Sequence, residues 1–185
     1  MGPYYFLVTL NPLSRDEVRA FIVEQGGELE SDFADGAIAT RNGRLTVRWA
    51  TDERVDSILQ SDNFVNTRRG IRDRRREYES LARIAETLGG VPHDFVRLDL
   101  LSRAGSQHLA VPFVEAFARR WSPCVLDTRE GLDTAEEGKD VWTMEDVFRL
   151  ARMQRRLPTT RHDIRLDLDY YEAKRKAEEA EGLDD

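Results

Sequence analysis

The sequence predicts an α+β fold, in which a mixed or antiparallel sheet has helices packed mainly on one face and the first half suits a ferredoxin-like unit. Three observations predict it. Short apolar or alternating segments recur along the chain, amphipathic segments lie between them, and glycine or proline pairs separate many of these segments. With 185 residues the chain suits one domain, which we expect to span residues 1–170, followed by a charged, partly disordered tail at 171–185.

The N-terminal residues predict a buried strand followed by a helix. Residues 4–10 are an apolar run that ends at a turn, which suits a strand inside a sheet. Ser14 and Glu17 have the spacing of a capping box, so we expect a helix to begin there. The pair Gly26-Gly27 ends this helix, because glycine readily adopts the left-handed conformation that closes helices.

A β-hairpin is predicted next. Residues 38–40 and 45–49 suit two strands, and Asn42-Gly43 between them favours a type I′ turn, in which both central residues need a positive φ. The second strand alternates apolar with polar side chains, so we expect one of its faces to be exposed to solvent. Its apolar positions are Leu45, Val47 and Trp49.

Residues 68–88 combine an arginine cluster with an amphipathic pattern. The stretch RRGIRDRRR holds six arginines, and the basic cluster comprises Arg68, Arg69, Arg72, Arg75 and Arg76. Apolar residues then recur at helical spacing up to Gly89-Gly90, which predicts a helix of about five turns. They are Tyr78, Leu81, Ala82, Ala85 and Leu88. Interspersed acids favour pairing of the cluster with acidic parts of the same chain, and contacts with a protein partner or with nucleic acid are the alternatives.

The next segment predicts a strand and a second long helix. Residues 95–101 suit a strand, and residues 106–121 carry an apolar face at helical spacing. Ser106 is the expected N-cap of this helix. Because Pro112 lacks a backbone N–H, we expect the regular helix to begin only near Val111.

The C-terminal third predicts two further strands around a helix. Residues 124–127 suit a short strand, in which Cys124 is expected to be a core residue. Thr143 stands three residues before Asp146 and suits the start of a helix. The inner face of this helix would hold Val147, Leu150 and Ala151. Residues 164–170 alternate strictly between apolar and polar, which is typical of a half-buried strand.

Composition excludes several classes of function. A formal net charge of −7 argues against generic binding to nucleic acid or to an anionic membrane, and favours a basic partner. The apolar run 4–10 is too short to span a membrane and no basic segment precedes it, so we expect a cytoplasmic protein without a signal peptide. Cys124 is the only cysteine, which rules out a multi-cysteine metal site, and no glycine-rich phosphate loop occurs. We therefore expect no cofactor.

Two kinds of fragment resemble metal-dependent enzymes. His93-Asp94 and His162-Asp163 are similar to the His-Asp pair of metal-dependent phosphohydrolases. Both pairs precede predicted strands and no third histidine has suitable spacing, so we expect loop or cap roles for them. The fragment DLDYYEAK resembles the metal-binding end of PD-(D/E)xK nucleases, which implies carboxylates that hold Mg²⁺ and a lysine that stabilises an attacking water. The residues concerned are Asp167, Asp169, Glu172 and Lys174.

With no convincing catalytic set, the sequence favours a non-enzymatic bacterial domain that binds another protein, in its specific form an immunity or antitoxin-like inhibitor of a basic partner. The expected contact surface is the acidic loop 130–140 with the face of Asp167 and Asp169, and Trp142 at its margin is either an aromatic anchor or a packing residue. The partner-binding candidates are Glu130, Asp133, Glu136, Glu137, Asp140, Trp142, Asp167 and Asp169. A metal-dependent nuclease and a nucleic-acid-binding protein that uses the basic cluster are the alternatives.

Overall fold

The structure is a computed structural model that describes residues 4–31, 33–51, 81–101, 104–128 and 141–158, and every structural statement below concerns these residues. A further helical segment, residues 81–88, lies in the chain between β4 and β5. In chain order the labelled elements are β1 (Tyr4–Thr9), α1 (Arg15–Glu24), β2 (Glu28–Leu29), β3 (Gly36–Thr40), β4 (Gly43–Trp49), β5 (Asp94–Leu100), α4 (Ala104–Arg120), β6 (Cys124–Asp127), β7 (Val141–Thr143) and α5 (Met144–Gln154).

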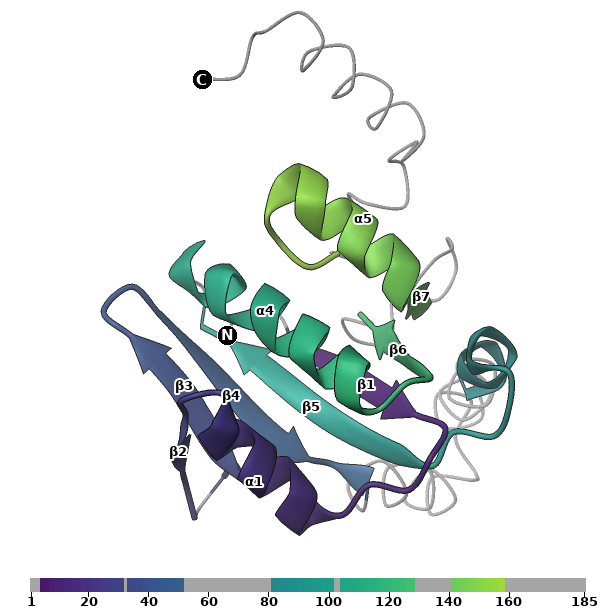
Figure 1. The fold of residues 1–185 in the computed structure, drawn as a ribbon, viewed down its shortest axis with the longest axis horizontal. Coiled ribbons are helices and arrows are strands. Elements are labelled where there is room, and N and C mark those ends of the chain that lie inside the picture. Colours follow the sequence, from purple (N-terminus) through teal and green to yellow (C-terminus); the bar gives the residue numbers. More distant parts are fainter. Residues whose placement is uncertain (1–3, 32, 52–80, 102–103, 129–140, 159–185) are drawn as a thin grey trace, which may run out of the picture.

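The strands form one seven-stranded antiparallel sheet in the order β2-β3-β4-β5-β1-β6-β7 (Figure 1), which confirms the predicted α+β class. Two connections contain a helix: α1 leads from β1 to the edge strand β2, and α4 leads from β5 to β6. Because β1 lies between β5 and β6 in the sheet, the α4 connection passes over β1. The ferredoxin-like first half stays a prediction, because β5, which lies between β1 and β4, comes from the second half of the chain.

Helices α1, α4 and α5 lie on the same face of the sheet (Figure 1), as the sequence predicts. Their apolar sides and the alternate inward residues of the strands form the main core. Phe21 of α1 joins the helices, since its ring contacts Phe113, Phe117 and Trp121 edge-on at centroid distances of 5.1, 6.0 and 4.9 Å. The main core comprises Tyr5, Leu7, Leu13, Val18, Phe21, Ile22, Leu45, Val47, Val96, Leu98, Leu100, Ala110, Phe113, Val114, Phe117, Ala118, Cys124, Leu126, Trp142, Val147 and Leu157.

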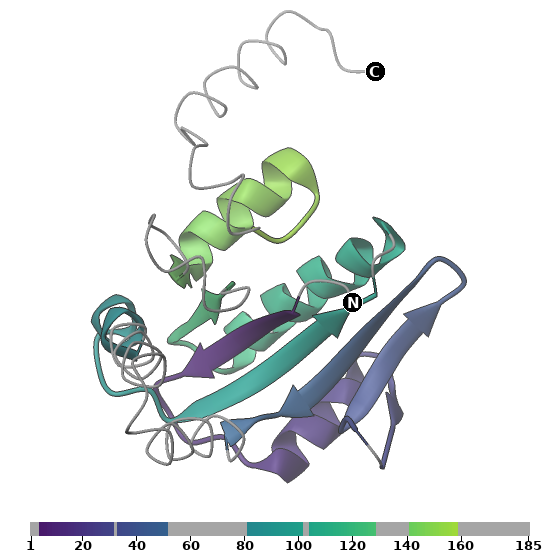
Figure 2. The ribbon, with the colours of Figure 1, turned by 180° about the vertical axis from the view of Figure 1, so that it is seen from behind.

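A smaller core lies on the opposite face, which Figure 2 shows from behind. There Ile84 and Leu88 of the 81–88 segment pack against a group that includes Phe6 and Phe95. The segment ends at Gly89, whose φ is +78°, so the predicted end of this helix is confirmed. The predicted apolar face is wrong in one respect: Ile84 is buried and Ala82 is exposed. The basic cluster at residues 68–76 lies outside the described residues.

The capping box of α1 is confirmed in both directions. The Ser14 hydroxyl accepts from the Glu17 amide at 3.3 Å, and the Glu17 carboxylate accepts from the Ser14 amide at 2.8 Å. The hydrogen bonds from the Ser14 backbone and hydroxyl lower the pKa of Glu17 below its ordinary value. The helix ends at Gln25, and Gly26 follows with a φ of +78°, as the glycine pair predicts.

The predicted hairpin forms as β3 and β4, but the predicted turn is wrong. Thr40 pairs with Gly43, so the loop is Arg41-Asn42, and none of these loop residues nor Gly43 has a positive φ. Gly43 instead allows a close approach of two backbones, because a Cβ at this position would lie 2.3 Å from the carbonyl carbon of Gly105 in α4. The hairpin therefore needs this glycine for tertiary packing and not for turn geometry.

Helix α4 begins at Ala104, earlier than predicted, and both the N-cap role of Ser106 and a start near Val111 are wrong. Ser106 lies inside the helix, where its buried hydroxyl accepts from the Arg44 amide at 3.1 Å. Pro112 is tolerated within the helix because it and His108, whose carbonyl loses its helical donor, lie at exposed positions.

The last described elements follow the sequence closely. Strand β6 has the predicted bounds, and Thr143 caps α5 by accepting from the Asp146 amide at 3.2 Å. The predicted inner face of α5 is buried, and the helix ends at Arg155. The two short edge strands β2 and β7 were not predicted. The predicted strand at residues 164–170 and the charged tail lie outside the described residues.

We expect Gly43→Ala to lower the free energy of unfolding by about 3 kcal/mol, because neither backbone at the contact can move away from an added methyl group. Chemical denaturation measures the effect. Gly26→Ala is the control: nothing lies within 4 Å of the added Cβ, and the positive φ alone costs about 1 kcal/mol. Equal losses in the two variants would contradict the close-approach role of Gly43.

Candidate interaction surface

Most of the predicted site residues lie outside the described residues. This holds for Glu130, Asp133, Glu136, Glu137, Asp140, Asp167 and Asp169, for the basic cluster, and for Glu172 and Lys174. The exception is Trp142 in β7, which is 1% exposed and whose indole N–H lies 3.3 Å from the Thr128 hydroxyl that accepts from it. The structure therefore favours a packing role for Trp142 over that of a surface anchor, and the acidic contact surface stays a prediction.

The most connected polar group is the buried carboxylate of Asp94, at the start of β5. It accepts from the Leu13 amide at 2.7 Å, from the Trp49 indole N–H at 3.2 Å and from the Thr51 hydroxyl at 2.7 Å. The His93 ring nitrogen Nδ1 lies 2.8 Å from the same carboxylate. With four neighbouring donors around it, Asp94 satisfies backbone and side-chain groups of separate segments, which is a structural role. His93 lies in the loop before β5, as expected, whereas Asp94 is the first residue of β5 and binds distant segments, so a loop or cap role is wrong for Asp94.

A second buried carboxylate, Asp35, has a similar role beside α1. It accepts from the Trp49 amide at 2.7 Å and forms ion pairs with Arg15 at 2.5 Å and with Arg19 at 3.7 Å. The side chain of Asp35 is fully buried, so its charge needs these cationic partners. The pairs attach α1 to the β3–β4 hairpin.

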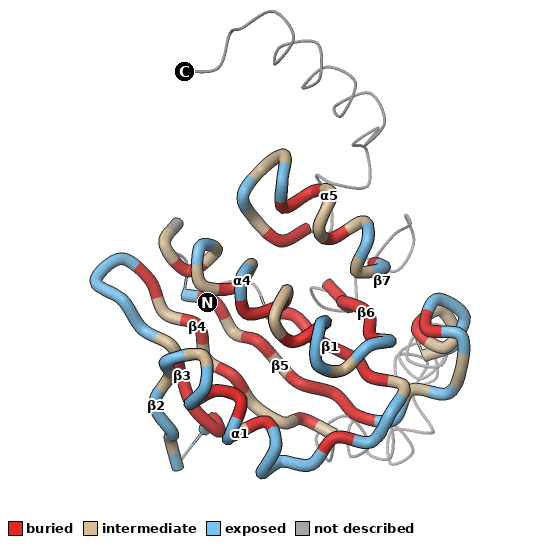
Figure 3. Tube along the Cα trace, in the orientation of Figure 1, coloured by how far each residue is buried: buried red, intermediate tan, exposed pale blue. Residues whose placement is uncertain are grey.

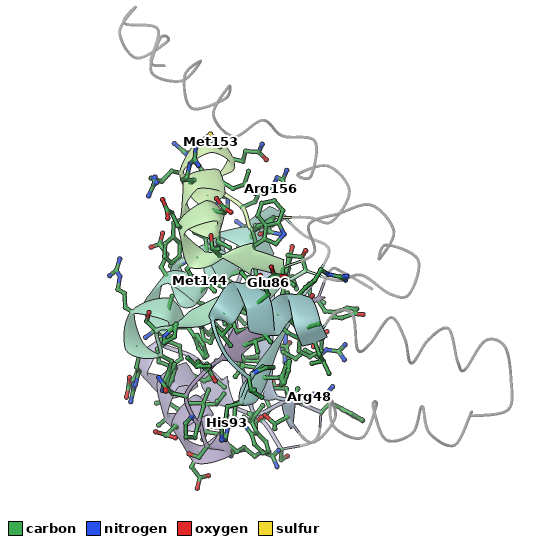
Figure 4. The ribbon with its side chains drawn as sticks, turned by 90° about the vertical axis from the view of Figure 1, so that its right-hand side faces the viewer. Arg48, Glu86, His93, Met144, Met153 and Arg156 are labelled. Carbon is green, nitrogen blue, oxygen red and sulfur yellow. The ribbon has the colours of Figure 1, made fainter. Side chains whose placement is uncertain are left out.

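The face of the sheet opposite α1, α4 and α5 carries a row of charged residues. Arg97 binds Asp99 through Nε and Nη2 at 2.8–3.0 Å and lies 4.7 Å above the Tyr4 ring. Arg48 is the cross-strand neighbour of Arg97, and Asp127 of β6 is fully buried. Figure 4 shows Arg48 and His93 at the opposite end of the molecule from Met153 and Arg156.

The described part of the chain holds neither a reactive thiol nor a cluster of metal ligands. Burial raises the pKa of Cys124 to about 12, so its thiol is protonated at neutral pH and is a poor nucleophile. The described ranges hold no group of three or more His, Cys, Asp or Glu side chains arranged to bind a metal ion. Within the same ranges, no helix has the length and apolar character to cross a membrane.

Three apolar side chains are exposed at the β2 edge of the sheet. Phe33 is 87% exposed, Val23 of α1 is 52% exposed and Leu29 of β2 is 46% exposed. Phe33 and Leu29 line a shallow hollow of about 390 Å³ together with Arg19, Glu30 and Ser31. Val23 lies one helical turn after Arg19, on the same side of α1. We call Val23, Leu29 and Phe33, with the acidic residues Glu24, Glu28 and Glu30, the β2 rim.

Two of the three glutamates of the β2 rim have arginine partners. Glu24 forms an ion pair with Arg120 of α4, and Glu30 forms one with Arg44 of β4. Glu28 is exposed at the outer edge strand. Figure 3 shows the exposed colour along much of β2 and the adjoining turns. The sequence did not reveal this surface, because its apolar residues stand alone among polar ones and show neither helical nor strand periodicity.

We expect Asp94→Asn to lower the free energy of unfolding by about 2–4 kcal/mol, because the amide group cannot accept from all the donors that surround it. Asp99→Asn is the matched control. It should cost less than about 1 kcal/mol, since Asp99 is 40% exposed and binds only at the surface. Chemical denaturation of both variants measures the difference. A loss as small for Asp94 as for Asp99 would show that the Asp94 contacts contribute little.

We expect the Cys124 thiol to react with a thiol reagent at pH 8 roughly a thousandfold more slowly in the folded than in the unfolded protein, because burial raises its pKa. Absorbance of the released chromophore follows the rate. Ala20→Cys places a thiol at an exposed position of α1 and should react rapidly in the folded state. Rapid labelling of Cys124 in the native wild type would disprove its core position.

Comparisons with known proteins assign no family to this chain. No family model matches the chain, and neither the curated proteins nor the solved structures contain a significant match.

Proposed function

We propose that this chain is a non-enzymatic protein-binding domain whose partner docks on the β2 rim. The observation that supports the proposal is the exposure of Phe33, which is 87% accessible beside Leu29 at 46% and Val23 at 52%. Single exposed apolar residues are ordinary on protein surfaces, but an aromatic ring grouped with aliphatic side chains at a hollow is typical of contact sites.

Burial of these side chains supplies a driving force for association. Moving a phenylalanine side chain from water into an apolar contact contributes about 1.5–3 kcal/mol. Because Phe33 lies beside a hollow that already contains Leu29, a partner can cover both without rearranging the core. Aromatic anchors of this kind carry a large share of binding energy in many interfaces.

The net charge of the chain supports a basic partner. Glu28 and Glu30 stand on either side of Leu29 in the sequence, Arg19 also lines the hollow, and the whole chain carries a net charge of −7. A negative surface accelerates association with a positively charged protein and disfavours acidic ones. We therefore propose the specific form of an immunity or antitoxin-like inhibitor that covers a basic enzyme, with the acidic residues at 130–140 as a further contact surface.

The test compares capture by wild-type chain with capture by two variants. The immobilised protein is exposed to a lysate of its source cell, and a retained protein is identified by mass spectrometry, purified and titrated by calorimetry. We expect Phe33→Ala to weaken its binding about 30-fold, the effect of losing an anchor of about 2 kcal/mol. Val91→Ala is the control, because Val91 is 82% exposed but lies outside the β2 rim, and it should change affinity less than about twofold.

The melting temperature must stay the same in both variants, since each side chain is exposed in the free protein. A partner that binds wild type and Phe33→Ala equally well would contradict the role of the β2 rim. A retained protein with an acidic rather than a basic surface would contradict the proposed charge complementarity.

A further inference from the structure

A second surface with the opposite charge lies at the C-terminal end of α5. Arg149, Arg152, Arg155 and Arg156 fall within eight residues that include no acid, and we call them the α5 arginine cluster. Arg149 and Arg152 are neighbours on the helix at i,i+3. Arg152 and Arg155 are exposed, whereas Arg149 and Arg156 are half-buried. The Arg156 guanidinium donates from Nη1 to the Leu157 carbonyl at 3.2 Å.

The backbone at Arg155 is unusual. This residue closes α5 in the left-handed conformation, with φ 54° and ψ 32°, and its amide donates to the Ala151 carbonyl at 2.8 Å. Among the described residues it is the only one other than glycine that has a positive φ. Glycine or asparagine normally occupies such a position, because a Cβ there is close to the following carbonyl. The chain thus carries an arginine where the backbone favours glycine.

Stabilisation of helix α5 explains the presence of some, but not all, of the arginines in the α5 arginine cluster. Cations near the C-terminus of a helix interact favourably with its dipole, and Arg152 provides this interaction from the last turn of α5. A second cation for the dipole does not need the left-handed site. An outlier of this kind points to a use of the side chain outside the local backbone.

We propose that the α5 arginine cluster binds an acidic segment of a partner protein through its carboxylates. Guanidinium groups form paired hydrogen bonds with carboxylates, and the four arginines lie within the eight residues 149–156. That length suits a short acidic segment. The proposal does not depend on the β2 rim, because α5 contacts β6 and β7 at the opposite edge of the sheet.

Nucleic acid fits this surface less well. Single-strand binding sites combine cations with exposed aromatic rings, and the aromatic residue of α5, Phe148, packs partly against the main core. Four arginines neutralise few phosphates, and a chain with a net charge of −7 repels an extended polyanion. A short peptide with a few carboxylates experiences much less of that repulsion.

The test uses the full-length chain and a fluorescent glutamate-rich peptide with carboxylates at i, i+3 and i+4, titrated by anisotropy at physiological ionic strength. We expect Arg155→Gly to weaken binding about fivefold, the effect of losing one charge-assisted pair. The same substitution should leave the melting temperature unchanged or raise it, because glycine suits the left-handed conformation. Arg152→Gln should weaken binding to a similar extent.

Arg41→Gln is the matched control, since Arg41 is an exposed arginine in the hairpin loop, and it should change peptide affinity less than about twofold. Equal losses of peptide affinity in Arg41→Gln and Arg155→Gly would show that binding depends only on the net charge of the protein, which would overturn the proposal. So would a glutamine-substituted peptide that binds as well as the acidic one, or a single-stranded RNA of equal charge that binds more tightly. A lower melting temperature of Arg155→Gly with unchanged peptide affinity would assign Arg155 a purely structural role.

Discussion

The buried carboxylate of Asp94 is the contact on which the arrangement of the first half of the chain depends. It accepts from Leu13, which lies 81 residues away in the chain, and from Trp49 and Thr51 at the end of β4. These donors come from the connection before α1 and from the strand that pairs with β5. Because a buried carboxylate is stable only when it is surrounded by donors, all three segments must meet at this point.

Asp35 extends this constraint toward α1 and the hairpin. Its contacts with the Trp49 amide, Arg15 and Arg19 place the helix against the end of β4 that Asp94 also holds. The aromatic contacts of Phe21 then fix α1 against α4 on the same face. The polar contacts define where the elements cross, while the apolar contacts supply most of the stabilisation.

This architecture leaves two different surfaces at the two edges of the sheet. The β2 edge combines exposed apolar side chains with glutamates, and the β7 edge is covered by α5, whose C-terminal end is rich in arginine. A protein with opposite charge patterns at its two ends can contact two partners, or two regions of one partner, without competition between the sites. The thiol of Cys124 lies inside the core and not at either surface.

The sequence by itself determined the features that depend on neighbouring residues. The capping box of Ser14 and Glu17, the cap of Thr143 and the alternation in β4 were predictable, because each involves groups no more than a few residues apart. The tertiary structure alone decided why Gly43 is needed, what Ser106 binds and that Phe33 is exposed. Each of these three features depends on which segment, distant in the sequence, packs beside the residue in the fold. Local patterns carry no information on that neighbour, since close packing and burial are set by contacts between residues far apart in the chain.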